Sequence, residues 1–316
     1  MTDCSKEIFE KYQVRKTSRQ KSDFRSYLMK HCESEGYGAR VERGSFGVNN
    51  VIVGDPDSAK VIFVAHYDTC PRLPFPNFIT PKSTVLYLIS QLLLVSVFMF
   101  LPTIIISVLA SAVTLYISGN EELALIVRSF SSSAVLWASV ILMLCGPANK
   151  HTANDNTSGV ITLVELMHAL PEQLRQHAAF VFFDLEESGL LGSSDFAKKH
   201  RKIAKETLVI NFDCVSDGEY ALFALRSGAG EYAELLESSY FPTDGITVDV
   251  AKRGTVYPSD QLAFKCGVGV AFLKKSKHGI VYMDRIHTNR DVIFREENVS
   301  FLTDGSVRLV DAISKK

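Results

Sequence analysis

The feature that most constrains the fold is a long apolar block near the middle of the chain. No charged residue occurs between Ser83 and Asn120, and only Arg128 occurs between Leu123 and Asn149. Since a run of about 20 apolar residues spans the hydrocarbon core of a bilayer, the block is long enough for two crossings. The alternative is a core helix of a soluble protein, but a stretch that is apolar on all sides has no polar face for water.

We expect this block to form a hairpin of two helices, Thr84–Ser118 and Leu123–Gly146, joined at residues 119–122 (GNEE). The first helix would be roughly 50 Å long, so it must tilt, bend at Pro102 or protrude from the membrane. Another division places a turn at Pro102 and a third segment at Ala134–Cys145. Two crossings are favoured because an even number is needed to bring the polar segments before and after the block together.

The charges around the block predict its orientation. Arg72, Lys82 and Lys150 flank its base, whereas Glu121 and Glu122 mark its tip. By the positive-inside rule, the base and the polar part of the chain then face the cytoplasm. The first 28 residues contain no apolar run typical of a signal peptide, and the six cysteines form no CxxC pair. Both observations favour a protein of the cell membrane whose polar domain lies in a reducing compartment.

The polar segments, residues 1–82 and 147–316, are expected to form one discontinuous domain, with residues 83–146 as the inserted hairpin. Strands are predicted at Ala39–Glu42, Val48–Val53, Val61–Ala65, Ala178–Phe183, Thr207–Phe212, Tyr220–Leu225, Ile246–Val250, Val268–Leu273 and Gly279–Met283. Helices are predicted at residues 5–33, Ser158–Leu170, Gly192–His200 and Glu296–Ile313. This alternation predicts an α/β fold with a mixed, mostly parallel β-sheet flanked by helices.

Two further features limit what the chain can do. The four prolines of residues 71–82 exclude a helix and indicate a linker. Lys and Arg total 34 against 35 Asp and Glu, a formal net charge of -1. The chain therefore lacks the basic excess of a nucleic-acid-binding protein, and we expect no nucleic acid among its partners.

Five short segments that carry acids or histidines follow predicted strands or begin a helix. They are residues 65–69 (AHYDT), 153–159 (ANDNTSG), 183–193 (FDLEESGLLGS), 211–213 (NFD) and 286–291 (IHTNRD). Residues far apart in sequence can meet at the carboxyl edge of a parallel sheet. Histidine and carboxylate ligands suit zinc or a similar divalent ion. Each segment alone is a common surface turn or helix cap, but the five together favour a metal site.

The order of these segments resembles peptidase family M28, the co-catalytic zinc aminopeptidases, over residues 40–82 and 147–310. The resemblance implies two Zn²⁺ ions: His66 and Asp213 would bind one, Glu187 and His287 would bind the other, and Asp155 would bridge them. It also implies that Glu186 is the general base and that Asp68 orients the imidazole of His66.

Two physical arguments agree with these roles. Adjacent side chains leave an extended turn in different directions, so Glu187 can bind metal while Glu186 faces the substrate water. Two neighbouring metal ions lower the pKa of the water between them, and a carboxylate can pass its proton to the leaving amine.

One segment departs from the family's pattern. Residues 257–264 (YPSDQLAF) resemble the family's Ser-Asp-His segment, but Gln261 stands where histidine is common. Tyr257 is a candidate oxyanion donor, and a core or rim tyrosine is the other interpretation. Cys70 and Cys214 lie next to site positions, and we interpret both as packing residues.

These observations predict a membrane-anchored dinuclear zinc aminopeptidase whose catalytic domain faces the cytoplasm and acts on peptides. A hydrolase of N-acyl amino acids or other membrane-associated amides is the alternative, because the apolar block begins 15 residues after Asp68. A non-catalytic scaffold and a single-zinc glutaminyl cyclase are disfavoured by the complete ligand set and Glu186. The membrane is expected to contact residues 84–146, which are also a candidate surface for homo-oligomerisation.

Overall fold

A mixed β-sheet runs through the polar part of the chain in the computed structural model, which describes residues 1–315. Its strands in that range are β1 (Ala39–Arg43), β2 (Asn49–Val53), β3 (Val61–His66), β4 (Ala178–Phe183), β5 (Leu208–Phe212), β6 (Tyr220–Leu225), β7 (Thr247–Ala251), β8 (Gly267–Lys275) and β9 (Val281–Tyr282). The order is β1-β2-β4-β3-β5-β8-β6-β7, and β9 pairs with β8. The central strands β4, β3, β5 and β8 are parallel, which confirms the predicted α/β fold.

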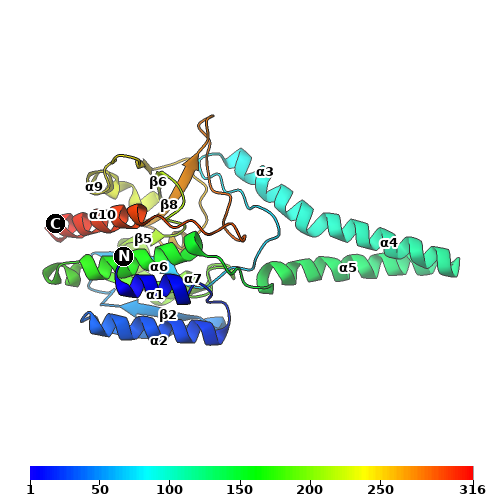
Figure 1. The fold of residues 1–316 in the computed structure, drawn as a ribbon, viewed down its shortest axis with the longest axis horizontal. Helices are drawn as coiled ribbons and strands as arrows, with labels where there is room; N and C mark the ends of the chain where they lie inside the picture. The colour runs from blue at the N-terminus through cyan, green and yellow to red at the C-terminus, as the bar shows by residue number, and fades with distance from the viewer. Residues whose placement is uncertain (316) are drawn as a thin grey trace.

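Helices cover both faces of this sheet (Figure 1). One apolar layer includes side chains of α1 (Asp3–Lys11), α2 (Ser18–Ser34), α6 (Gly159–Ala169), α9 (Ala233–Ser239) and α10 (Glu296–Ser314). The other includes side chains of α7 (Leu191–Lys199) and α8 (Arg201–Glu206). Strand β3 serves both layers: Phe63 packs into the first and Val64 into the second. This alternation follows from the period-2 geometry of a strand.

The helix predicted over residues 5–33 is wrong as one element, because α1 ends at Lys11 and α2 begins at Ser18. The Thr17 side chain accepts from the Gln20 N–H, and the Gln20 side chain accepts from the Thr17 N–H, which forms a capping box. A Thr-x-x-Gln pattern was the sequence signal for this new start. The short helices α8 and α9 were not predicted.

The apolar block forms a helical hairpin that projects from the α/β body (Figure 1). Its first arm is continuous through α3 (Thr84–Val95), a π-helical turn at Ser96–Phe100 and α4 (Leu101–Ser118). Gly119 ends α4 with a φ of 62°, and the second arm is α5 (Glu121–Cys145). Pro102 lies inside this continuous arm, directly after the π-helical turn, and a π-bulge is a local irregularity of the kind found at such positions in long helices. The division with a turn at Pro102 is therefore wrong.

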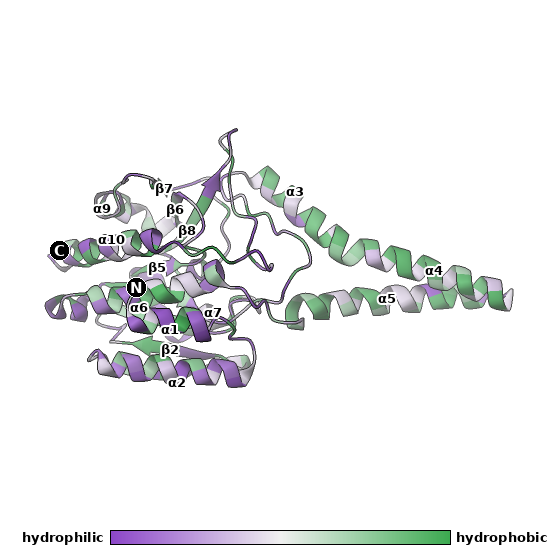
Figure 2. Cartoon of the chain, viewed as in Figure 1, coloured by the Kyte–Doolittle hydropathy of each residue, from purple (hydrophilic) through white to green (hydrophobic). Residues whose placement is uncertain are grey.

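Hydrophobic residues predominate along the hairpin, whereas the helices of the body mix hydrophobic and hydrophilic residues (Figure 2). Within residues 1–315, two helices are long and apolar enough to cross a membrane, Thr84–Ser118 and Glu121–Cys145. Their large apolar side chains are exposed: Leu92 by 64%, Phe130 by 78% and Trp137 by 66%. These two helices are therefore not core helices of this chain.

The two ends of the hairpin return to the body close to each other. Pro71 pairs with Ala148 in an isolated antiparallel bridge, and the Arg72 N–H donates to the Pro147 carbonyl oxygen at 2.8 Å. Further along the proline-rich segment 71–82, Ile79 pairs with Met283 of the body. This segment contains no helix, as predicted, but the body holds it in place.

Candidate metal centre

The polar segments singled out in the sequence meet at the carboxyl ends of the central parallel strands. His66 ends β3, Glu186 and Glu187 follow β4, and Asp213 directly follows β5. Asp155 comes from the turn before α6, and His287 comes from the loop after β9. Together they line a cavity of about 310 Å³.

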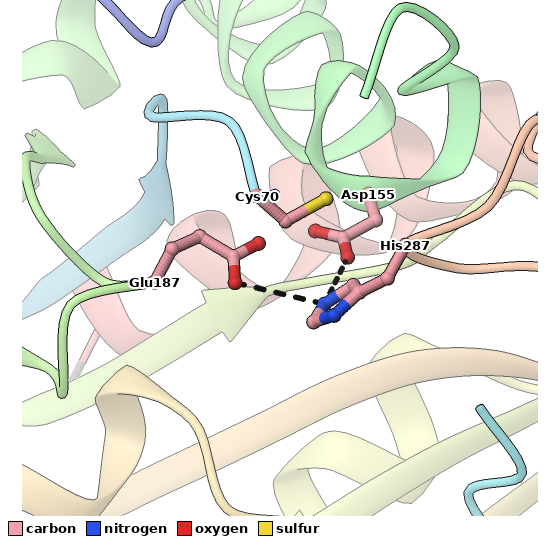
Figure 3. Close-up of side chains that lie close together, drawn as sticks. All are labelled: Cys70, Asp155, Glu187 and His287. Atoms are coloured by element: carbon pink, nitrogen blue, oxygen red, sulfur yellow. Dashed lines mark ion pairs between the residues drawn. The ribbon is translucent and has the colours of Figure 1, made fainter. Parts of the chain in front are cut away.

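Asp155 lies between two groups of side chains. His66 Nε2 lies 3.4 Å from Asp155 Oδ1 and 3.5 Å from Asp213 Oδ1. His287 Nε2 lies 3.0 Å from Asp155 Oδ2 and 3.6 Å from Glu187 Oε2 (Figure 3). Each histidine thus faces a different oxygen of one carboxylate, as bridging by Asp155 requires. The roles implied by the resemblance remain predictions.

Asp68 connects the first group to the glutamates. Its Oδ1 lies 3.5 Å from His66 Nδ1 and accepts the Glu186 N–H at 3.0 Å. Its Oδ2 accepts the Glu187 N–H at 3.2 Å. One buried carboxylate therefore positions both a histidine and the turn that carries both glutamates.

Two glycines of the motifs allow helices to start against the strand ends. A Cβ on Gly159 would lie 2.3 Å from the Phe212 carbonyl oxygen, and one on Gly192 would lie 2.2 Å from the Asp184 carbonyl oxygen. Asn156 fixes the first junction, because its amide donates to the Phe212 carbonyl oxygen at 2.9 Å and its Oδ1 accepts the Gly159 N–H at 3.0 Å.

The backbone is strained at four positions in or beside the cavity. The φ angles are 56° at Leu185, 59° at Leu190, 58° at Cys214 and 61° at His287. Residues other than glycine rarely adopt this left-handed backbone conformation, and such strain concentrates at functional sites.

Burial raises the pKa of three carboxyl groups in or beside the cluster. Burial raises the pKa of Glu186 well above its usual range. The Glu187 carboxylate raises this pKa further, and the His66 imidazole lowers it in part. Burial likewise raises the pKa of Glu187 to about 8. The Asp155 carboxylate adds to this rise, and the His287 imidazole opposes it. For Asp260, burial raises the pKa to about 7, which the His66 imidazole opposes. Carboxyl groups crowded in this way are costly to ionise without nearby cations.

The histidines and Asp155 show the opposite effect. Burial lowers the pKa of His287, but the Glu187 and Asp155 carboxylates outweigh it and raise that pKa to about 9. Burial also lowers the pKa of His66, but the Glu186, Asp155 and Asp213 carboxylates outweigh it, so this pKa lies well above its usual range. For Asp155, burial is outweighed by His287 and His66, so its pKa lies below its usual range. The cluster therefore favours positive charge between its carboxylates.

The donors fit a divalent metal ion. Two ligands at about 2.0–2.1 Å from one tetrahedral zinc ion lie about 3.3 Å apart. The donor pairs around Asp155 are separated by 3.0 to 3.6 Å. Imidazole nitrogens and carboxylate oxygens are suitable zinc ligands, and cations would offset the repulsion between the buried carboxylates.

Cys70, interpreted from the sequence as a packing residue, is fully buried and lies beside this cluster. Its Sγ and donor atoms of Asp155, Glu187 and His287 all lie within 4.8 Å of one another (Figure 3). Its place two residues after Asp68, in the loop that follows β3, was the available sequence signal. Asp291 was also left without a role, although its carboxylate accepts the Asp155 N–H at 3.0 Å.

Arg15 supports the cluster from the break between α1 and α2. Its buried guanidinium donates to the carbonyl oxygens of Tyr67 and Tyr12 and, at 3.2 Å, to Thr157 Oγ1. Burial lowers the pKa of Arg15 to about 10, against the effect of Asp68 and Asp155. No motif pointed to this residue, because the sequence pattern placed it inside a helix.

Tyr257 lines the cavity, but its hydroxyl donates to the Asp213 carbonyl oxygen at 2.9 Å. Gln261 lies behind it: its Nε2 donates to the Tyr257 carbonyl oxygen at 2.6 Å, and its Oε1 accepts from Asn211 at 3.0 Å. Gln261 therefore supports the backbone of Tyr257. The role of Tyr257 as an oxyanion donor remains a prediction.

The outer wall of the cavity comes from segment 71–82, which the sequence pattern presented only as a linker. Asn77 and Ile79 line the cavity, and the Leu73 N–H donates to the His287 carbonyl oxygen at 2.7 Å. Helix α3 holds the same wall, because Gln91 Nε2 donates to Asn77 Oδ1 at 3.2 Å. The hairpin is thus hydrogen-bonded to a side of the cavity.

Known proteins share features of this chain. A sequence model described as "Peptidase family M28" matches residues 137–303. The glutaminyl cyclase of Porphyromonas gingivalis aligns with a TM-score of 0.57 and 16% identity, over 98% of this chain and 97% of that chain. The LapA aminopeptidase of Legionella pneumophila aligns with a TM-score of 0.57 and 11% identity, over 99% and 70%. None of the curated proteins compared with the chain matches it. At these identities the structural likeness concerns the fold.

Proposed function

Because the chain belongs to peptidase family M28, we propose that it is a metallo-aminopeptidase that hydrolyses N-terminal peptide bonds and is held in a membrane by its hairpin. The observation that carries this proposal is the position of Asp155 between His66 and His287, with Glu186 lining the same cavity. These are the parts that a co-catalytic metal site and a general base need.

The residues present would hold two divalent ions, with zinc as the expected metal. We assign His66 and Asp213 to one ion, Glu187 and His287 to the other, and Asp155 to both. Bound there, the ions would supply Lewis-acid polarisation of the scissile carbonyl and a lower pKa for the attacking water.

The chain's own groups then orient the reaction and move its proton. Glu186 accepts the proton of the attacking water through its carboxylate and delivers it to the leaving amine. Asp68 keeps that carboxylate in place by accepting the backbone N–H groups of Glu186 and Glu187. Tyr257 would stabilise the oxyanion only after releasing its hydrogen bond to the Asp213 carbonyl oxygen.

The cavity suits the end of a peptide better than its middle. Its volume of about 310 Å³ is at the lower end of ligand pockets, and the wall at Asn77 and Ile79 limits it on one side. One terminal residue and the bond after it match such a space, which favours exopeptidase action.

We also propose that residues 83–146 are a membrane insertion in a peptidase domain formed by residues 1–82 and 147–316. The exposed apolar side chains of both arms need a non-aqueous environment, and arms of this length span a bilayer core of about 30 Å. Arg72, Lys82 and Lys150 at the base favour a domain that faces the cytoplasm.

A second candidate is the hydrolysis of a membrane-associated amide, such as an N-acyl amino acid. The observation that favours it is the contact between the cavity wall and α3: Gln91 binds Asn77, and Ser90 Oγ donates to the Phe78 carbonyl oxygen at 2.7 Å. A substrate that lies along the membrane surface would reach the cavity next to this wall.

The testing experiment measures substrate turnover by detergent-purified protein with and without a chelator. The substrates are aminoacyl p-nitroanilides, the same compounds with blocked amines, N-acyl amino acids, and a peptide with an N-terminal glutamine. Chelator-sensitive release from free-amine anilides alone is the expected result.

The other outcomes separate the alternatives. Turnover of acylated substrates only would replace the aminopeptidase by the second candidate. Ammonia release from the glutaminyl peptide without anilide cleavage would identify a cyclase. Bound metal with no turnover of any substrate would contradict both candidates and indicate a scaffold.

A further inference from the structure

We propose that Cys70 is a direct ligand of the metal ion bound by His287, so that the two halves of the site differ in chemistry. The His287 half-site here means Asp155, Glu187, His287 and Cys70, and the His66 half-site means His66, Asp155 and Asp213. The inference rests on the proposed function because it requires a metal at this cluster.

The position of the sulfur carries the inference. Cys70 Sγ and the donors of Asp155, Glu187 and His287 lie within 4.8 Å of one another, and the side chain is fully buried. Figure 3 shows the sulfur next to the Asp155 carboxylate. Four side chains from four separate segments therefore place their donor atoms in one small volume.

The main chain holds Cys70 in this position. Its carbonyl oxygen accepts the Asn149 N–H at 3.0 Å, and the next residue, Pro71, pairs with Ala148. Asp68, two residues earlier, accepts the N–H groups of Glu186 and Glu187. The sulfur thus approaches the cluster from a backbone fixed on both sides.

Cys214 provides a comparison within the same cavity. It is also buried beside the cluster, but its thiol donates to Asp213 Oδ1 at 3.2 Å, and its sulfur belongs to neither donor group. Cys214 behaves as a hydrogen-bonded neighbour of a ligand, whereas Cys70 occupies the place of a ligand.

The consequence is a division of labour between the half-sites. The His287 half-site offers four donors, one sulfur, one nitrogen and two carboxylates, which is the closed set of a tightly held zinc ion. The His66 half-site offers three, which leaves a position for water or substrate. Glu186 adjoins that open position, because its carboxylate and donors of His66 and Glu187 lie within 4.8 Å of one another.

The sulfur also predicts metal preference. Thiolate ligands favour zinc and other soft ions over Mg²⁺ and Mn²⁺. We therefore expect the His287 half-site to retain zinc when a chelator has already emptied the His66 half-site.

The test is zinc X-ray absorption spectroscopy of the full-length, detergent-purified protein saturated with Zn²⁺. We expect a zinc–sulfur distance of about 2.3 Å beside nitrogen and oxygen ligands at about 2.0–2.2 Å. The Cys70→Ser variant should lose the sulfur signal, and its affinity for the more tightly bound zinc ion should fall at least about 10-fold. The control Cys145→Ser removes an exposed thiol and should retain the signal.

Each result decides between the proposals. Zinc bound by nitrogen and oxygen alone in the unaltered protein overturns the role of Cys70, even if the variant fails to fold, and leaves the metallopeptidase proposal intact. A sulfur signal that persists in Cys70→Ser also overturns it. A purified protein that binds no zinc overturns both proposals.

Discussion

The α/β body and the hairpin use apolar residues in opposite ways. In the body, every residue of β3 is buried, and its side chains alternate between two layers covered by helices. In the hairpin, large apolar side chains of both arms are exposed, as Leu92 and Phe130 show. A strand pattern that alternates specifies neighbours within the protein, whereas a helix that is apolar on every side specifies its surrounding medium.

Polar residues show the reverse contrast. The body buries charged side chains, such as Asp155 and Asp68, at the ends of its strands. The hairpin carries only three charged side chains, Glu121, Glu122 and Arg128, and the neutral side chain of Gln91 holds the cavity wall. The regions meet at residues 71–82, so the strongest tests of this contrast change one region and measure the other.

The largest expected effect is confined to the body. Replacing Glu186 by Gln keeps the shape of the side chain but removes the proton acceptor, so kcat should fall by about 10²- to 10⁴-fold. Zinc content, measured by elemental analysis, should stay the same. Glu206→Gln, on an exposed turn of α8, is the matched control. Unchanged turnover in Glu186→Gln would contradict the proposed mechanism.

Removing the hairpin should abolish membrane association and leave zinc binding intact, and the loss of the Gln91 hydrogen bond should lower kcat/KM only slightly. A variant in which a flexible linker replaces residues 84–145 should leave the membrane fraction on sedimentation while it still binds zinc and hydrolyses soluble substrates. The reason is that the sheet and the proposed metal ligands lie outside these residues. Loss of zinc binding in a folded variant would show that the body depends on the hairpin.

Trp137 supplies a direct measure of the medium around the hairpin. It is the single tryptophan of the chain, lies in α5 and is 66% exposed. In reconstituted vesicles, brominated lipids should quench its fluorescence strongly, whereas a soluble quencher should have little effect. The opposite pattern would place the hairpin in water and contradict the membrane proposal.

Replacing one large apolar side chain by alanine in each region should change the free energy of unfolding by very different amounts. Phe63 is fully buried between the rings of Phe180 and Phe212, so Phe63→Ala should lower the free energy of unfolding by about 3–5 kcal/mol. Ile105 in α4 is 47% exposed, and Ile105→Ala should change the free energy of unfolding by about 0.5 kcal/mol or less. Denaturant titration followed by near-UV circular dichroism measures both, and equal losses would break the comparison.

The smallest expected effect lies where the regions meet. Gln91→Leu keeps α3 apolar and helical but removes the hydrogen bond to Asn77, so kcat/KM should fall by about 10-fold or less. Ser111→Ala, in α4, is the control for a polar change in the hairpin away from the cavity. Equal kinetics in both variants would show that α3 does not position the wall.

The sequence was informative wherever one local pattern decided the outcome. The strand runs, the helices after residues 158 and 296, and the continuous apolar arms could all be predicted because periodicity and length determine them. The break between α1 and α2 was missed, since both sides share an amphipathic pattern and only the capping box at Thr17 marks the new start. Segment 71–82 was identified as non-helical, but its place beside His287 follows from contacts distant in sequence.

The sequence by itself determined which groups are available for chemistry, because His66, Asp155, Glu186 and the other motif residues stand at predicted strand and helix ends. It also predicted that the apolar block forms helices long and apolar enough to cross a membrane. Only the tertiary structure decided that Asp155 faces both histidines, that Cys70 joins the His287 group, and that α3 holds the wall of the cavity. The physical reason is range: propensity and periodicity act over a few residues, whereas these contacts depend on how sheet and loops pack together.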